Sequence, residues 1–111
     1  MQHDIPEITA VELKSRLDRG DALTIIDVRE PHEWDIASLG HYGARLIPLG
    51  ELPRRIREVD ASRDVVVHCK AGGRSARALH QLREAGVKRV WNLHGGILAW
   101  AADVDPALPR Y

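Results

Sequence analysis

Short apolar runs, too brief for helices, predict the strands of a sheet. The run at 23–28 is rich in β-branched residues, the run at 65–67 repeats that pattern, and 90–93 is a weaker copy. Strands that are apolar on both faces are typical of a parallel sheet that helices cover on each side. A further strand is expected at 45–49, where Pro48 restricts it to the sheet edge or to a strand end.

Helix signals alternate with these strands. Thr9 stands three residues before Glu12, a capping box that predicts a helix continuing through Leu17 until Gly20 ends it. Further helices are expected at 52–59, at 75–85 with Ala78, Leu79 and Leu82 inward, and after Gly95-Gly96 with Ile97 and Trp100. Strands alternating with helices indicate an α/β fold with a mostly parallel sheet.

Length and charge narrow the possible functions. The 111 residues have room for one domain, so we expect a single domain over 1–111 with extended tails at 1–6 and 103–111. Sixteen basic and sixteen acidic side chains leave no net charge, and the pI is near 7.0. This balance argues against the broad basic face that nucleic acid or an anionic membrane requires, so we expect neither as a partner.

The location and the metal content also follow from the sequence. We expect a cytoplasmic protein, because 1–10 lacks the features of a signal peptide and no apolar run approaches the roughly 20 residues that span a bilayer. The single cysteine, Cys69, cannot form an internal disulfide, which fits a reducing compartment. The six histidines show no metal-ligand spacing, so we expect no metal and no cofactor.

Cys69 is the candidate nucleophile. It comes directly after the strand at 65–67 and His68, at the edge of a parallel sheet where ligands bind. A free cysteine is often an ordinary buried residue. Packing alone, however, does not call for the two glycines, the lysine and the arginine that follow this one.

The loop after Cys69 has the composition of an anion site. Gly72 and Gly73 allow successive backbone N–H groups to point toward the sulfur, and a helix beginning near Ser75 adds its partial positive charge. Lys70 and Arg74 supply full charges. Such surroundings lower the pKa of a thiol, so we expect Cys69 to be a thiolate at neutral pH.

Three segments carry a family resemblance. The loop Cys69-Lys70-Ala71-Gly72-Gly73-Arg74-Ser75 resembles the active-site loop of the rhodanese (sulfurtransferase) family. The segments 27–34, 43–44 and 47–49 resemble the family's upstream signature, and Gly95-Gly96-Ile97 with Trp100 resembles its C-terminal one. The chain looks most like the rhodanese domains fused to activating enzymes of molybdopterin and thiamine synthesis, and we expect a stand-alone relative of these.

The resemblance implies a fold and an activity. The implied fold is a five-stranded, mostly parallel sheet with helices on both faces. The implied activity moves a sulfane sulfur from thiosulfate or another persulfide donor, through a Cys69 persulfide, to a thiol, cyanide or a sulfur-carrier protein. The implied substrate-binding residues are those that surround the sulfur, namely Lys70, Ala71, Gly72, Gly73, Arg74 and Ser75.

Two alternative functions compete with sulfur transfer. Related folds use a Cys-loop-Arg motif in phosphatases and arsenate reductases, but their loops have five residues between the cysteine and the arginine, whereas Cys69 and Arg74 enclose four. The shorter loop fits one sulfur atom better than a tetrahedral anion. The second alternative is a non-catalytic interaction module, and such rhodanese-like domains typically lack the cysteine.

Residues outside the loop have simpler interpretations. Asp27 and Arg29, at a strand end, are expected to form an ion pair that braces the loop. His68 is interpreted as a buried core histidine rather than a base. His94 is either an ordinary loop residue or part of the mouth of the site.

Overall fold

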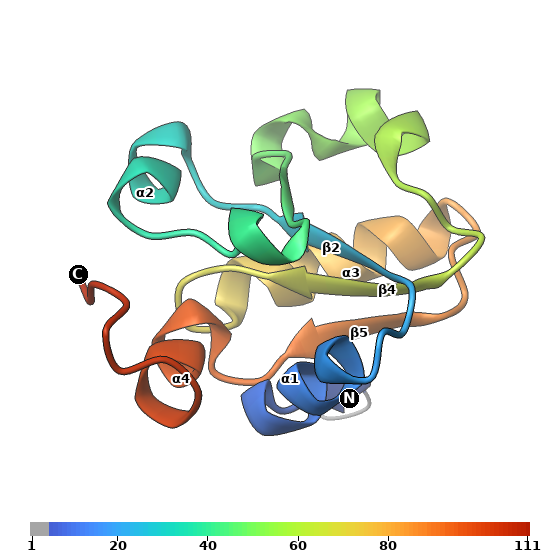
Figure 1. Cartoon of the computed structure of the whole chain (residues 1–111). Coiled ribbons are helices and arrows are strands. Elements are labelled where there is room, and N and C mark those ends of the chain that lie inside the picture. The colour runs from blue at the N-terminus through green and yellow to red at the C-terminus, as the bar shows by residue number, and fades with distance from the viewer. Residues whose placement is uncertain (1–4) are drawn as a thin grey trace.

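The computed structural model describes residues 5–111 and shows one parallel sheet (Figure 1). Its strands are β1 (Glu7–Ile8), β2 (Leu23–Asp27), β3 (Arg45–Leu46), β4 (Asp64–His68) and β5 (Val90–Leu93). The order across the sheet is β1-β5-β4-β2-β3, and every neighbouring pair is parallel. The expected five-stranded α/β sheet is therefore confirmed, with β4 at its centre.

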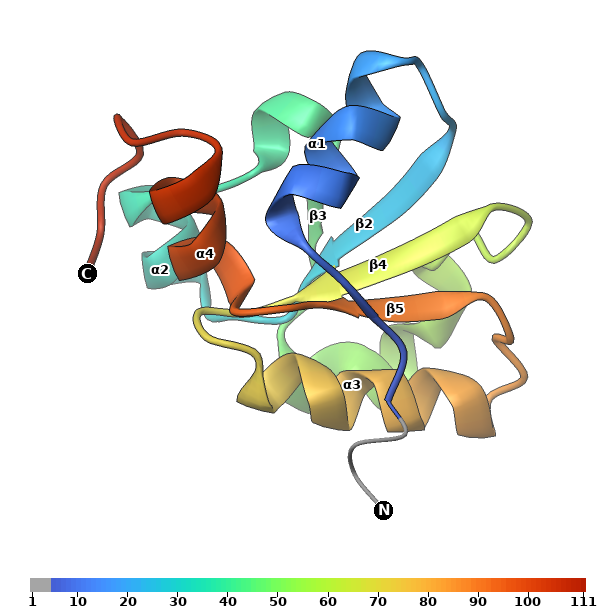
Figure 2. The same cartoon turned by 90° about the horizontal axis from the view of Figure 1, so that it is seen from below.

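Helices cover both faces of this sheet. They are α1 (Ala10–Asp18), α2 (Pro31–Ile36), α3 (Gly73–Glu84) and α4 (Gly96–Asp103), together with the 3-10 segments η2 (Gly40–Tyr42) and η3 (Leu49–Glu58). Figure 2 shows α1 and α4 on one face and α3 on the other, where η3 packs against it. The carboxyl ends of the strands point toward the end of the molecule where α2 and the segment after α4 lie (Figure 1).

The apolar run of β4 is explained by two hydrophobic cores. Val65 and Val67 face the core under α3 and η3, whereas Val66 faces the core under α1 and α4. All three valines are fully buried. A strand between two helical layers has no solvent face, so it has no polar alternation.

Most of the expected helix boundaries are confirmed. The Thr9 hydroxyl accepts from the Glu12 N–H, and the Glu12 carboxylate accepts from the Thr9 N–H, so the capping box opens α1 as predicted. The expected edge strand is β3, which pairs only with β2. The helix α3 begins at Gly73, slightly before the predicted start at 75, and buries Ala78, Leu79 and Leu82 as expected.

The helix expected at 52–59 is wrong in type and extent. The segment η3 runs from Leu49 to Glu58 as 3-10 turns with a break at Arg55, whose φ is −114°. Pro53 lies inside it and has no N–H to donate, which disfavours a regular α-helix. Leu52 is nevertheless buried on the inward side, as the apolar spacing indicated.

The C-terminal tail differs from the extended expectation, whereas most of the N-terminal tail cannot be compared with it. Residues 1–4 lie outside the described part, and β1 begins at Glu7. The helix α4 includes Asp103, and the Leu108 N–H donates to the Asp105 carbonyl in a turn. The last residue described, Tyr111, packs against Arg29 rather than trailing over the surface.

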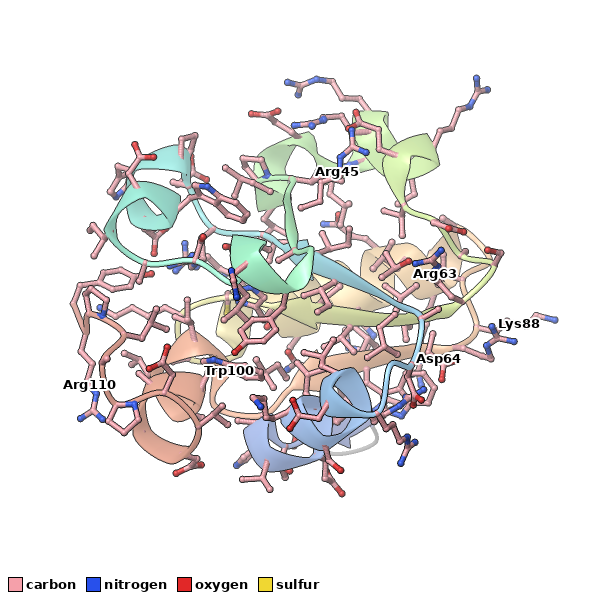
Figure 3. The ribbon with its side chains drawn as sticks, in the orientation of Figure 1. Arg45, Arg63, Asp64, Lys88, Trp100 and Arg110 are labelled. Atoms are coloured by element: carbon pink, nitrogen blue, oxygen red, sulfur yellow. The ribbon has the colours of Figure 1, made fainter. Side chains whose placement is uncertain are left out.

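The two ends of the sheet carry different groups. Figure 3 shows Arg63, Asp64 and Lys88 at one end, and Arg110, on the segment after α4, at the other. At the first end, Asp64 pairs with Arg16 and Arg89. None of the helices in 5–111 is long and apolar enough to cross a membrane.

Candidate active site

Cys69 lies at the carboxyl end of the central strand, as the sequence predicted. It follows β4 directly, and the loop after it leads into α3. The residue is only 1% exposed, so Cys69 is enclosed although it lies at the edge of the sheet. Cys69 belongs to the hydrophobic core under α3, and the loop after it places N–H groups against the sulfur.

Three donors converge on the Cys69 sulfur. The Gly72 N–H lies 3.1 Å from Sγ, the Ser75 N–H 3.4 Å, and the Ser75 hydroxyl 3.3 Å. Gly72 has a φ of +119°, a left-handed conformation that glycine adopts without strain. The curled backbone therefore points donors inward, in the arrangement that suits an anion.

These donors change the acidity of the thiol. Burial raises the pKa of Cys69, but hydrogen bonds from the Ser75 hydroxyl and from the backbone N–H groups of Ser75 and Gly72, with a smaller contribution from the Ala71 N–H, lower it by more. The pKa therefore lies below its ordinary value. The sequence predicted this direction, and the charge of Arg74, one of the two charges that it credited, does interact with Cys69.

Both cationic side chains of the loop are engaged away from the sulfur. Arg74 makes a two-point ion pair with Glu33, with N–O distances of 2.7 and 2.9 Å. The Lys70 ammonium lies 4.3 Å from the centre of the Tyr111 ring. The donors on Sγ are accordingly neutral groups of the loop rather than the two charges.

The helix α4 holds the other side of the loop. The N–H of Ile97 donates to the Cys69 carbonyl at 2.9 Å, and the N–H of Leu98 donates to the Lys70 carbonyl at 3.1 Å. Gly96 has a φ of +61°, and a Cβ there would lie only 2.6 Å from the Cys69 carbonyl oxygen. The glycine pair at the start of α4 thus allows the backbone of this helix to approach the nucleophile loop.

The remaining loop residues flank this cradle. Ala71 is exposed, and Gly73 is the first residue of α3. A pocket of about 430 Å³ borders the loop on the β5 side, and its lining includes Ala71, Gly72 and His94. His94 is largely exposed and lies 3.2 Å from the Glu7 carboxylate, so it stands beside the loop.

A buried polar cluster supports the strand ends. Arg29 makes a two-point ion pair with Asp27, as the sequence predicted, and both side chains are fully buried. His68 is also buried, and its Nε2 lies 3.7 Å from the Asp27 carboxylate without a hydrogen bond. Burial lowers the pKa of His68, so the ring is neutral at pH 7, in line with a core residue rather than a base.

Sequence reasoning missed three residues at the site: Glu33, Asn92 and Tyr111. Glu33 had a readable signal, because Pro31 and an acidic residue two positions later are typical of a helix start. Asn92 accepts from the Ser75 hydroxyl at 2.6 Å, and only the strand pairing shows this contact. The described residues 5–111 contain no cluster of histidine, cysteine and acidic side chains that could hold a metal ion.

Comparisons with known proteins agree with this geometry. The probable adenylyltransferase/sulfurtransferase MoeZ of Mycobacterium tuberculosis is 42% identical over 106 residues, which cover 94% of this chain and 26% of that protein. A sulfurtransferase of Allochromatium vinosum is 38% identical over 97 residues, covering 87% of this chain and 89% of that protein. The chain thus spans about a quarter of the first relative and most of the second.

Structural comparison and the family match lead to the same assignment. The crystal structure of a rhodanese-like domain protein from Staphylococcus aureus matches with a TM-score of 0.81 and 28% identity, covering 96% of this chain and 99% of that one. The family model of the rhodanese-like domain matches residues 9–103, from the cap of α1 to the end of α4. The chain therefore belongs to the rhodanese-like family of sulfurtransferases and sulfur carriers.

Proposed function

We propose that this protein is a sulfurtransferase that carries a sulfane sulfur as a persulfide on Cys69. The observation that carries the proposal is the cradle around the sulfur, in which Gly72 and Ser75 provide three donors within 3.4 Å. A thiolate in such a setting is nucleophilic at neutral pH. The same donors suit the anionic persulfide that must persist until an acceptor arrives.

The first half-reaction loads the sulfur. The Cys69 thiolate attacks the sulfane sulfur of thiosulfate or of another persulfide donor, and a new S–S bond forms. The donor's S–S bond breaks, and sulfite, or the donor's thiolate, leaves with the electron pair. The step uses no general base, because the donors that lower the pKa of Cys69 favour its ionised form; this agrees with the neutral, buried His68 beside it.

The second half-reaction transfers the outer sulfur of the Cys69 persulfide to an acceptor. A nucleophile such as cyanide, a small thiolate or a cysteine thiolate on a sulfur-carrier protein attacks the outer sulfur and forms a bond to it. The S–S bond to Cys69 breaks, and Cys69 leaves as a thiolate. The lowered pKa of Cys69 assists this step, because a thiol of lower pKa is a better leaving group. A reducing cytoplasm suits this cycle, since the single cysteine must stay free to react.

The loop length favours sulfur over phosphate. Only four residues separate Cys69 from Arg74, and Arg74 pairs with Glu33. Phosphate-monoester chemistry needs donors at the anion's peripheral oxygens. The N–H groups of Gly72 and Ser75 instead reach the cysteine sulfur itself.

Thiocyanate formation from thiosulfate and cyanide tests the proposal. We expect the purified chain to produce thiocyanate and Cys69→Ser to produce none. The matched control is Ser15→Ala on α1, an equally small change outside the cradle, which should retain the wild-type rate. Equal thiocyanate formation by Cys69→Ser and the wild type would overturn the proposal.

A further inference from the structure

Tyr111 connects the segment after α4 with the rim of the candidate site. Its hydroxyl accepts from Nη1 of Arg29 at 2.8 Å and donates to Oε1 of Glu33 at 2.8 Å. Its ring faces the Lys70 ammonium at 4.3 Å. In both views of the fold, this segment ends beside α2, the helix that carries Glu33 (Figures 1 and 2).

Both cations of the nucleophile loop, Lys70 and Arg74, have partners at this rim. The Glu33 carboxylate accepts hydrogen bonds from both Arg74 and Tyr111. The positive charge of Arg74 is therefore balanced by the carboxylate at the rim. Lys70 keeps its charge, but a cation over an aromatic face is attracted to that face and restrained there. Without Tyr111, the flexible four-carbon stem of Lys70 could turn its charge over the adjacent Cys69.

We propose that Tyr111 is a specificity-determining residue that restrains Lys70 and so weakens the attraction of the site for small, highly charged inorganic donors. This inference rests on the proposed sulfurtransferase function. The donor class that it favours is an organic persulfide, on a thiol or on a protein cysteine. Such a donor carries less charge on its reacting group than the thiosulfate dianion. An unrestrained Lys70 would therefore attract it less strongly than it would attract thiosulfate.

Charge-selective alkylation of Cys69 measures this restraint without sulfur transfer. Iodoacetate and iodoacetamide attack the same thiolate and differ chiefly in charge, so the ratio of their rates reports the local potential. Accessibility of the buried sulfur largely cancels in this ratio. We expect Tyr111→Ala to raise the iodoacetate-to-iodoacetamide ratio about threefold, the scale of one unit charge several ångströms away in water.

Three companion variants separate the ring from other effects. Tyr111→Phe keeps the aromatic face over Lys70 and should keep the wild-type ratio. Tyr111→Leu keeps apolar bulk without an aromatic face, so it should reproduce Tyr111→Ala even if the alanine loosens the packing. Adding Lys70→Met to Tyr111→Ala should abolish the rise, because the charge itself is then absent.

The kinetic counterpart is a lower KM for thiosulfate. In Tyr111→Ala we expect the KM to fall about ninefold, since the two charges of the donor double the interaction energy and so square the threefold factor, with kcat changed less than about twofold. An unchanged or lower alkylation ratio in Tyr111→Ala and Tyr111→Leu, or a rise that persists with Lys70→Met, would overturn the inference. A wild type that takes no sulfur from any donor would instead refute the proposed function, while the alkylation ratios would still test the restraint.

Discussion

The hydroxyl oxygen of Ser75 lies 2.6 Å from the side-chain amide oxygen of Asn92. The same hydroxyl is 3.3 Å from the Cys69 sulfur and 3.3 Å from the Gly72 carbonyl oxygen, so its single proton has three acceptors within reach. Asn92 also donates to the Gly72 carbonyl at 3.2 Å, which fixes the orientation of its amide. Strand β5 thereby holds the serine where it can donate to a charged sulfur.

Ser75→Ala should therefore raise the pKa of Cys69, because it removes a donor that stabilises the thiolate. The rate of alkylation by iodoacetamide, followed against pH, should reach its plateau at higher pH than in the wild type. Loss of one hydrogen bond to a charged group should also slow sulfur loading about tenfold. A profile that coincides with the wild type would show that the hydroxyl does not act on the sulfur.

Glu33 should make stability depend on pH. Hydrogen bonds from Arg74 hold the pKa of this carboxyl well below its model-compound value of 4.5, despite the opposing effect of burial. The contribution of Glu33 to the free energy of unfolding is therefore complete above about pH 4.5 and is lost as the pH falls further. Glu33→Gln should lower the free energy of unfolding at pH 7 by about 1 to 3 kcal/mol.

Urea titrations at several pH values check the Glu33 prediction. The wild type should lose stability between about pH 4.5 and pH 2 more steeply than Glu33→Gln, because the variant lacks the titrating group. Parallel acid limbs for the two proteins would contradict the assigned role of this carboxylate.

Gly96 should be far less replaceable than Gly50. A Cβ at Gly96 meets the backbone carbonyls of Cys69 and Lys70 at a positive φ, whereas a Cβ at Gly50 meets nothing within 4 Å. Gly96→Ala should cost about 2 kcal/mol or more in unfolding free energy, and Gly50→Ala about 0.5 kcal/mol or less. Equal thermal midpoints for the two variants would show that the close approach of α4 is not required.

The size of the loop gives a prediction about reaction class. The wild type should show no hydrolysis of p-nitrophenyl phosphate that depends on Cys69. A glycine inserted between Gly72 and Gly73 should move the Gly72 and Ser75 donors relative to Sγ and reduce sulfur transfer at least tenfold, since such stabilisation depends on distance. Robust phosphatase activity in the wild type, lost in Cys69→Ser, would favour the phosphatase alternative instead.

Elements set by local patterns were predictable from the sequence. Three features have signals that lie within a few residues of one another in the sequence. They are the capping box at Thr9, the two-sided apolar run of β4 and the glycines after Cys69. The position of Cys69 at the sheet edge followed from the same patterns. The resemblance then supplied the persulfide chemistry, which no periodicity contains.

Contacts between distant segments could not be predicted in this way. The pairing of Glu33 with Arg74 joins residues 41 positions apart, and that of Tyr111 with Arg29 joins residues 82 apart. Both loop cations looked free in the sequence because their partners lie on other elements. The break of η3 at Arg55 was not predicted either, because apolar spacing does not distinguish 3-10 turns from an α-helix over so few residues.

Intact mass spectrometry of the chain after treatment with thiosulfate tests the central claim most directly. The wild type should gain the mass of one sulfur atom, cyanide should remove it, and Cys69→Ser should gain nothing. Prior alkylation of Cys69 should block the gain as well. A wild type that gains no sulfur from thiosulfate or from an organic persulfide, or a Cys69→Ser variant that gains it equally, would contradict the account.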